Sequence, residues 1–411
     1  MNIYELYPLT TANFDTTSAV DVNDNGDVVG SCWFYWHNQP GKPARTATLW
    51  EKTRFLRWKL YKYYSYHPTP LTNSQNLSEG LKINNRGEVV YVEYDSPTNY
   101  GNPTFFLWKK NNSTINLHTV ITDLQQILDM NDQGEILATK KDGSVIIHNL
   151  DQGTHRILPS PPGSIIGLDN MGRVAVKSPL NELLYNIYWL PQNSSVWVKA
   201  EFNAFFGISL SKDGLILAAI ADNNNLQFPW GRAGYYDLNQ SKPSFILIPS
   251  RLSLPNHPPS YPLHMSTAYD CAQGKIVGTE GYSFPVLFDI KSNELVDMSD
   301  WFSEHVRAEQ ARGISHTGHI IGYGIINFGT PINQVRAWLL EMYHEPSRFG
   351  SPLTYPLPWP WPQPWPLIMI LGGGLLTLDG SMLISKLIGI ITIVVGIAGF
   401  VISLSQTGRR S

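Results

Sequence analysis

Two short stretches of the sequence carry residue types and spacings that could bind a metal ion. "DVNDNG", Asp21 to Gly26, places oxygen-bearing side chains at every second residue before a glycine, as in the first half of an EF-hand calcium loop. The position at which such a loop needs a bidentate glutamate is Cys32. "HTGH" places His316 and His319 around a glycine, with no third ligand nearby in the sequence. We therefore predict no metal and no cofactor.

Motifs for nucleophilic or metal-assisted hydrolysis are missing from the sequence. No GxSxG or HExxH occurs, and "SLSKDGLI" resembles the Asp-box of sialidases only faintly because its aromatic end is missing. The sequence thus favours a non-enzymatic protein. A hydrolase acting on glycans is the alternative.

A third stretch, "TRFLRWKLYKYY", mixes four basic residues with aromatic ones: Arg54, Arg57, Lys59 and Lys62. It could be a patch for an anionic partner. The alternative, which the sequence favours, is an outer strand whose charges discourage edge pairing, followed by the loop that leaves it.

The composition indicates many short strands and gives no sign of nucleic-acid binding. Charged residues are 15% of the 411 residues, aromatic residues are 12%, and the net charge is −3. Cys32 and Cys271 are too few for a disulfide framework.

One pattern recurs seven times along the chain, as in "AVDVNDNGDVVG", "GLKINNRGEVVY" and "ILDMNDQGEILA". Each copy has a glycine that is followed by an apolar run: Gly26, Gly87, Gly134, Gly172, Gly214, Gly274 and Gly318. Three residues before these glycines stand Asn23, Asn84, Asn131, Asp169, Ser211, Cys271 and Ser315. Five residues before them stand Asp21, Lys82, Asp129, Gly167, Ser209, Tyr269 and Gly313, which is not a set of calcium ligands. The pattern therefore predicts glycine-closed turns between strands.

Each repeat continues with two further apolar segments, which predicts four strands, a to d, in every unit. In the first unit "TATLW" is expected as strand c, "EKT" as the turn and "TRFLRW" as strand d. Consecutive apolar residues after each glycine indicate strands buried on both faces. We predict an all-β, seven-bladed propeller of four-stranded antiparallel blades. The seventh unit lacks a fourth strand, and Asn2 to Leu9 is expected to supply it and close the ring.

The long connections of such a ring all join strands b to c or d to a, so they lie on one face. We predict that this face binds a glycan, peptide or protein, because loops on a rigid scaffold are common binding surfaces. The candidate ligand-binding residues are Trp33, Tyr35, Trp36, Tyr63, Tyr64, Phe228, Trp230, Arg232 and Tyr261. The alternative is that these side chains only pack the loops against the blades.

The repeats resemble the HAF repeat of bacterial, often extracytoplasmic proteins. "AVDVNDNGDVVG…RTATLW" and "GLKINNRGEVVY…TFFLW" carry the resemblance most strongly. It implies a repeated fold element and transfers no catalytic residue. Proteins of this kind often carry a secretion signal, which is not apparent in "MNIYELYPLTTANFD".

The C-terminal part of the sequence predicts a membrane anchor. Leu387 to Ser405 has no charge and would span roughly 28 Å as a helix. We divide the chain into a propeller (1–345), a Pro/Trp-rich linker (346–366), a short apolar segment (367–381), a transmembrane helix (382–406) and a basic tail (407–411). A single span with an extracytoplasmic propeller is slightly favoured. Residues 367–381 could instead form a re-entrant or hairpin arm, which would leave the propeller in the cytoplasm.

Overall fold

The computed structural model describes residues 3–9, 16–33, 45–58, 61–97, 100–111, 113–220, 231–249, 266–280, 284–302, 306–326 and 334–343. The chain divides into two compact units, Met1–Glu345 and Pro346–Ser411, and all the described residues belong to the first. The predicted linker, apolar segment, transmembrane helix and basic tail lie outside them. Among the described residues, no helix is both long and apolar enough to cross a membrane.

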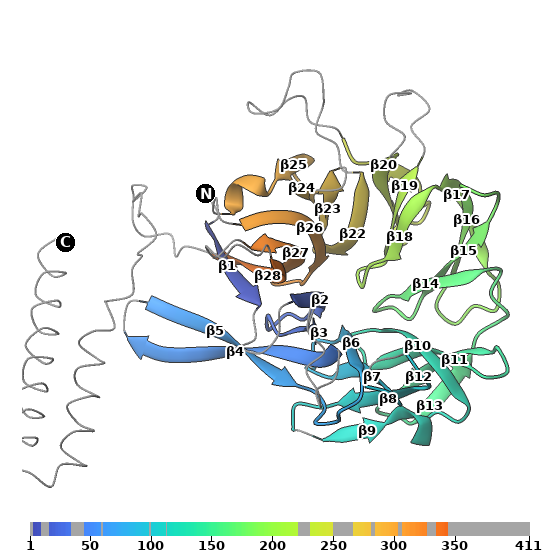
Figure 1. The fold of residues 1–411 in the computed structure, drawn as a ribbon. Helices are drawn as coiled ribbons and strands as arrows, with labels where there is room; N and C mark the ends of the chain where they lie inside the picture. The colour runs from blue at the N-terminus through green and yellow to red at the C-terminus, as the bar shows by residue number, and fades with distance from the viewer. Residues whose placement is uncertain are drawn as a thin grey trace, which may run out of the picture. The chain divides into compact units, whose positions relative to one another are not determined.

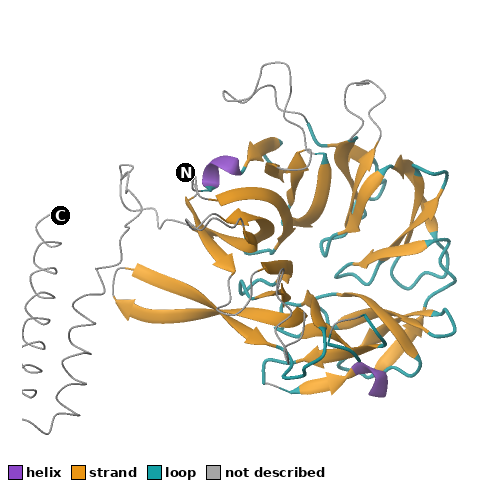
Figure 2. Ribbon diagram, in the orientation of Figure 1, coloured by secondary structure: helices purple, strands orange, loops and turns teal. Residues whose placement is uncertain are grey.

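The first unit is a seven-bladed β-propeller of four-stranded antiparallel sheets (Figure 1). This confirms the predicted fold. Apart from two short 3₁₀ turns, Leu117–Thr119 and Ser299–Trp301, the regular structure of its described residues is all strand (Figure 2).

The first three blades take strands β2 to β13 in chain order. Blade 1 holds β2 (Thr16–Val22), β3 (Val28–Trp33), β4 (Arg45–Trp58) and β5 (Tyr61–Pro70). Blade 2 holds β6 (Ser78–Ile83), β7 (Val89–Tyr94), β8 (Pro103–Trp108) and β9 (Thr114–Asn116). Blade 3 holds β10 (Leu124–Met130), β11 (Glu135–Lys140), β12 (Val145–Asn149) and β13 (Thr154–Ile157).

The next three blades repeat this order. Blade 4 holds β14 (Ser164–Leu168), β15 (Val174–Pro179), β16 (Tyr185–Leu190) and β17 (Val198–Ala204). Blade 5 holds β18 (Phe206–Leu210), β19 (Leu215–Ile220), β20 (Arg232–Asp237) and β21 (Phe245–Leu247). Blade 6 holds β22 (Thr267–Ala272), β23 (Lys275–Glu280), β24 (Phe284–Asp289) and β25 (Glu294–Asp297).

Blade 7 joins the two ends of the propeller sequence. It holds β26 (Val306–Ile314), β27 (Ile320–Ile326) and β28 (Gln334–Tyr343), and its fourth strand is β1 (Ile3–Leu9). β1 runs antiparallel to β28, from Ile3 opposite Tyr343 to Leu9 opposite Ala337. The predicted closure by the N-terminal strand is thereby confirmed.

Among the residues that the structure describes, the hydrophobic core forms seven clusters, and each cluster unites two neighbouring blades. The second strands supply much of it because they are covered on both faces: Val28 and Val29, for instance, are both fully buried. The cluster between blades 7 and 1 contains Leu9, Trp50 and Leu339. Packing therefore continues around the whole ring.

Two strand assignments made from the sequence were wrong. In blade 1, "TRFLRW" continues strand c as part of β4, and strand d is β5, so "EKT" is no turn. Tyr63 and Tyr64 accordingly lie in β5 and not in a connection between blades. In blade 4 the expected strand d, "SSVWVK", is replaced by β17, which pairs from Trp189↔Val198 to Tyr185↔Ala204. In both places the apolar pattern also fits the neighbouring register, and cross-strand pairing selects between them.

The blades give the ring two distinct ends. The a–b and c–d turns lie at one end, which we call the turn face, and the b–c and d–a connections lie at the other, which we call the loop face. All seven repeat glycines on the turn face have positive φ, between 73° and 85°. A side chain is strained in this conformation, which explains why glycine recurs there.

Candidate functional site

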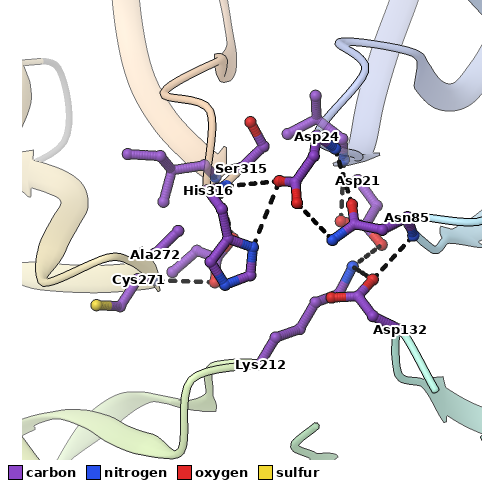
Figure 3. A pocket seen from close by; sticks show the side chains of 12 residues that line it. Asp21, Asp24, Asn85, Asp132, Lys212, Cys271, Ala272, Ser315 and His316 are labelled. Atoms are coloured by element: carbon purple, nitrogen blue, oxygen red, sulfur yellow. Dashed lines mark hydrogen bonds and ion pairs between the residues drawn. The ribbon is translucent and has the colours of Figure 1, made fainter.

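The mouth of the central channel on the turn face is lined by polar residues from six blades. Its cavity has a volume of about 10 Å³, which is room for about one water molecule. The lining includes Asp24, Asn85, Asp132, Lys212 and His316 (Figure 3). None of these residues was predicted as a site residue.

Asp24, Asn85 and Asp132 reach the mouth because they occupy the same place in consecutive a–b turns. The backbone N–H of Asp24 donates to Asn85 Oδ1 (2.8 Å), and that of Asn85 donates to Asp132 Oδ1 (2.9 Å). Asp132 N–H continues the series to Asn170 Oδ1 (2.9 Å). Each turn is thus hydrogen-bonded to the next blade. Asp or Asn two residues before the glycine, in four successive repeats, is the sequence signal for this series.

His316 completes the mouth by linking three blades. Its backbone N–H donates to Asp24 Oδ1 in blade 1 (2.7 Å), and its Nε2 lies 2.7 Å from Asp213 Oδ1 in blade 5. Its Nδ1 lies 3.4 Å from the same Asp24 oxygen. The hydrogen bond with Asp213 outweighs burial and raises the pKa of His316 to about 9. The imidazole is therefore cationic at neutral pH, with a carboxylate near each nitrogen, and is poorly suited to act as a general base.

Lys212 provides a second cation at the mouth. Its Nζ donates to the carbonyl oxygen of Ile83 (3.0 Å) and lies 3.6 Å from Asp132 Oδ1 and 3.7 Å from Asp21 Oδ2. Burial alone would lower the pKa of Lys212, but Asp21 and Asp132 raise it. The ammonium group therefore stays charged and holds acidic residues of blades 1 and 3.

Deeper in the channel, three carboxylates join neighbouring inner strands. Asp21, Asp129 and Asp270 each accept the next backbone N–H of their own strand (2.8–2.9 Å). Each also accepts an N–H from the next blade, at 3.1 Å from Ile83, 2.8 Å from Leu168 and 3.0 Å from Ile314. Burial raises the pKa of Asp270 to about 6. These oxygens are occupied by the backbone, which excludes the calcium-loop interpretation of Asp21.

The repeat position assigned to Tyr269 was wrong, because Asp270 is the true counterpart of Asp21. The a–b turn of blade 6 is one residue shorter than that of blade 1. Gln273 and Gly274 form a two-residue turn with φ of 50° and 73°. Cys271 is consequently an interior residue equivalent to Val22, and it is not a turn cap.

His316 and His319 do not converge. His319 is buried, with Nε2 3.3 Å from Lys52 Nζ and 3.7 Å from Glu341 Oε1. Across the described part of the chain, no three His, Cys, Asp or Glu side chains are grouped so that they could hold a metal ion.

On the loop face, the structure describes only some of the predicted ligand-binding residues. Tyr35, Trp36, Phe228, Trp230 and Tyr261 lie outside the described residues, and so do the side chains of Tyr63 and Tyr64. Arg232 starts β20 and donates through Nη2 to the carbonyl oxygen of Ile248 (3.1 Å). Ile248 directly follows β21 (Phe245–Leu247), so this hydrogen bond holds the end of the outermost strand of blade 5.

Trp33 belongs to an aromatic–arginine cluster that spans blades 1 and 2, which we call the loop-face cluster. The Arg45 guanidinium carbon lies 4.6 Å from the centre of the Trp33 ring, and Arg45 also pairs with Glu79. Tyr100 OH accepts from Arg45 (3.0 Å) and donates to Glu79 (2.9 Å). The Tyr100 ring packs edge-on against Tyr94, with centroids 4.9 Å apart, yet the residue is 62% exposed.

Comparisons with known proteins return structural likeness alone. No protein-family model and no curated protein sequence matches the chain. Among solved structures, the β-propeller domain of the Trilobed protease from Pyrococcus furiosus is 12% identical, with a TM-score of 0.47, over 80% of this chain and 98% of that one. YCF48 bound to D1 peptide is 11% identical, with a TM-score of 0.46, over 84% and 96%. YCF48 from Cyanidioschyzon merolae is 10% identical, with a TM-score of 0.45, over 82% and 98%. Likeness at this level carries no argument about function, and the fold rests on the strand pairing described above.

Proposed function

We propose that the propeller is a non-enzymatic binding module whose loop face recognises a glycan, peptide or protein. The observation that carries this proposal is the loop-face cluster, in which the exposed Tyr100 is fixed by Arg45, Glu79 and Tyr94. Tyrosine, tryptophan and arginine are the residues most enriched among binding hot spots. Because the cluster is already ordered, a ligand would meet it at little entropic cost.

The channel mouth supports a structural role more than catalysis. Asp24, Asp132 and Asp213 accept backbone N–H groups or pair with His316 and Lys212, so these carboxylates already have partners. The hydrolase alternative would need a carboxylate free to act as acid, base or nucleophile. For this reason we place the binding site on the loop face.

The proposal includes a membrane tether formed by residues 382–406 and a relationship to HAF-repeat proteins. The uncharged run Leu387–Ser405 supports the tether, and the seven glycine-containing repeats support the relationship. Both topologies remain part of the proposal: a single span with the propeller outside the cytoplasm, or an apolar hairpin with the propeller inside it. Protection of the propeller from protease in intact cells distinguishes them.

Array binding with single-site variants tests the loop face. The full chain, in detergent micelles, is applied to glycan and peptide arrays beside Tyr100→Ala and Trp33→Ala. Each variant is expected to weaken binding at least about tenfold, as loss of a hot-spot side chain does. Met171→Ala is the matched control, because Met171 is 54% exposed but lies on the turn face.

Two results would contradict the proposed function. One is binding that survives both loop-face changes. The other is turnover of a glycan that disappears on a single Asp or Glu change in a loop-face connection while the circular dichroism of the variant is unchanged, which would establish the hydrolase instead.

A further inference from the structure

The hairpin β4–β5 extends well beyond the blade that contains it. β3 pairs with β4 only from Arg45 to Trp50. Beyond Trp50, β4 pairs with β5 alone, from Glu51↔His67 to Trp58↔Tyr61. Figure 1 shows these two strands projecting away from the ring as a separate ribbon. We call residues 51–58 and 61–67 the β4–β5 ribbon.

The outer part of the ribbon is made only of basic and large apolar or aromatic residues. Positions 54–58 read "RFLRW" and positions 61–64 read "YKYY". They contain three basic residues and no acidic one, whereas the whole chain has 30 Lys and Arg against 33 Asp and Glu. A chain that is slightly acidic overall would not be expected to carry such a basic segment by chance.

We expect a two-stranded ribbon of this composition to bind another surface. Two strands alone are marginally stable in water, and two-stranded ribbons with many apolar residues tend to associate. A second copy of the ribbon is a poor cover because both copies are basic. Tryptophan and tyrosine favour the headgroup level of a bilayer, and lysine and arginine are attracted to anionic lipids.

The position of the ribbon in the ring favours a membrane over other anionic partners. β4 runs from the loop face to the turn face and ends there at Trp58, and β28 runs the same way and ends there at Tyr343. Blades 1 and 7 are neighbours that share a hydrophobic cluster. The chain beyond Tyr343 contains the uncharged run Leu387–Ser405. β4 and β28 therefore end on the same face of the ring.

We propose that the β4–β5 ribbon lies on an anionic lipid surface and turns the turn face toward the bilayer. The contact goes beyond the proposed C-terminal tether and is independent of any ligand on the loop face. It would leave the loop-face cluster directed away from the lipid.

A fluorophore on the ribbon tests this contact. The full chain is placed in nanodiscs of phosphatidylcholine alone or mixed with phosphatidylglycerol, with an environment-sensitive label on Ser65→Cys. Cys32 and Cys271 are buried, so the label goes to the new thiol. Emission is expected to shift to shorter wavelength in anionic discs only. The same label on Ser160→Cys, an exposed site on the loop face, is expected to stay in water.

A charge-reversed variant identifies the residues responsible. Arg54→Glu, Arg57→Glu and Lys62→Glu together should abolish the shift in anionic discs. Each basic residue near such a surface contributes about a factor of five, so the loss of three weakens the contact between ribbon and lipid at least about 100-fold. Unchanged circular dichroism would show that the variant still folds.

Several outcomes would overturn the proposal. One is a label on the ribbon whose emission does not shift in anionic discs, and another is an equal shift in neutral discs. A third is loss of the shift when a single-stranded oligonucleotide is added, which would make the ribbon a nucleic-acid-binding surface. A chain that fails to join neutral discs would refute the C-terminal tether alone. Flotation with phosphatidylglycerol vesicles would then test the ribbon separately.

Discussion

At the scale of single residues, the channel mouth shows how charges can be buried without catalysis. His316 and Lys212 come from blades 7 and 5, and each holds carboxylates of other blades. Their contacts join turns of blades that are not neighbours in the ring, which the hydrophobic packing between adjacent blades does not connect directly. We interpret these two cations as clamps on the turn face.

The clamp at His316 predicts a pH dependence of stability. The folded pKa, about 9, lies above the ordinary value of 6.5, so the folded chain binds this proton more tightly than the unfolded chain does. The resulting stabilisation is complete below pH 6.5 and is lost as the pH rises through about 9. We expect the wild-type free energy of unfolding to fall by roughly 1–2 kcal/mol across this window, after allowance for solvent screening.

His316→Gln keeps the backbone bond to Asp24 but removes the titrating group. Denaturant unfolding at pH 6.5 and pH 9 should therefore show a smaller fall for this variant than for the wild type. Equal falls would mean that the ion pair with Asp213 does not stabilise the folded state. Asp213 has a lowered pKa, since its bonds to His316 and Gln273 outweigh burial, so its own contribution is lost only at acid pH.

At the scale of elements, the inner strands are shaped by a repeated β-bulge. In all seven, the register with strand b shifts at the same repeat position. The residues that end the shift are Asp21, Lys82, Asp129, Gly167, Ser209, Asp270 and Gly313. A bulge leaves backbone groups unpaired and re-aims side chains. At three of these positions an aspartate bonds to the N–H groups of two blades.

Removing one of these aspartates should destabilise the propeller. Asp129→Ala would leave the buried N–H groups of Met130 and Leu168 without their acceptor. It would also remove the ion pair between Asp129 Oδ1 and Lys82 Nζ, which are 2.9 Å apart. We expect a loss of roughly 2–4 kcal/mol in urea unfolding.

Asp142→Ala is the matched control for this change. Asp142 is exposed and caps a turn inside blade 3 by accepting from Ser144, so its loss should cost less than about 1 kcal/mol. Equal effects of the two variants would rule out a special role for the inner aspartates.

At the scale of the whole molecule, stability depends on the pairing of the two ends of the propeller sequence. β1 completes blade 7 and carries Leu9 into the cluster between blades 7 and 1. Without β1, β28 becomes an unpaired edge strand and this cluster loses a fully buried leucine.

Deletion of residues 1–9 should therefore lower the melting temperature of the whole propeller. Adding the peptide "NIYELYPL" in trans should restore part of the loss, because the peptide can pair with the free edge of β28. Thermal unfolding of the deleted chain, with and without peptide, measures both effects. A truncated chain as stable as its parent would show that the closure contributes nothing.

The sequence by itself determined the number of blades, the glycine turns and the closing strand. These features are local: a positive φ selects glycine wherever it recurs, and burial on both faces selects consecutive apolar residues. Counting the apolar segments of each unit shows that the last unit lacks a fourth strand. The apolar segment at the N-terminus is the available substitute.

Only the tertiary structure decided which polar residues meet in the channel and where blade 1 turns. Asp24, Lys212 and His316 are far apart in sequence, and ring closure brings them together. The apolar residues of "TRFLRW" fit a continuation of strand c as well as a separate strand d. Only its pairing with β5 shows that it continues strand c. Blade 6 likewise reveals its shortened turn only through register, because a one-residue shift leaves the local composition unchanged while it exchanges Tyr269 for Asp270 in the repeat.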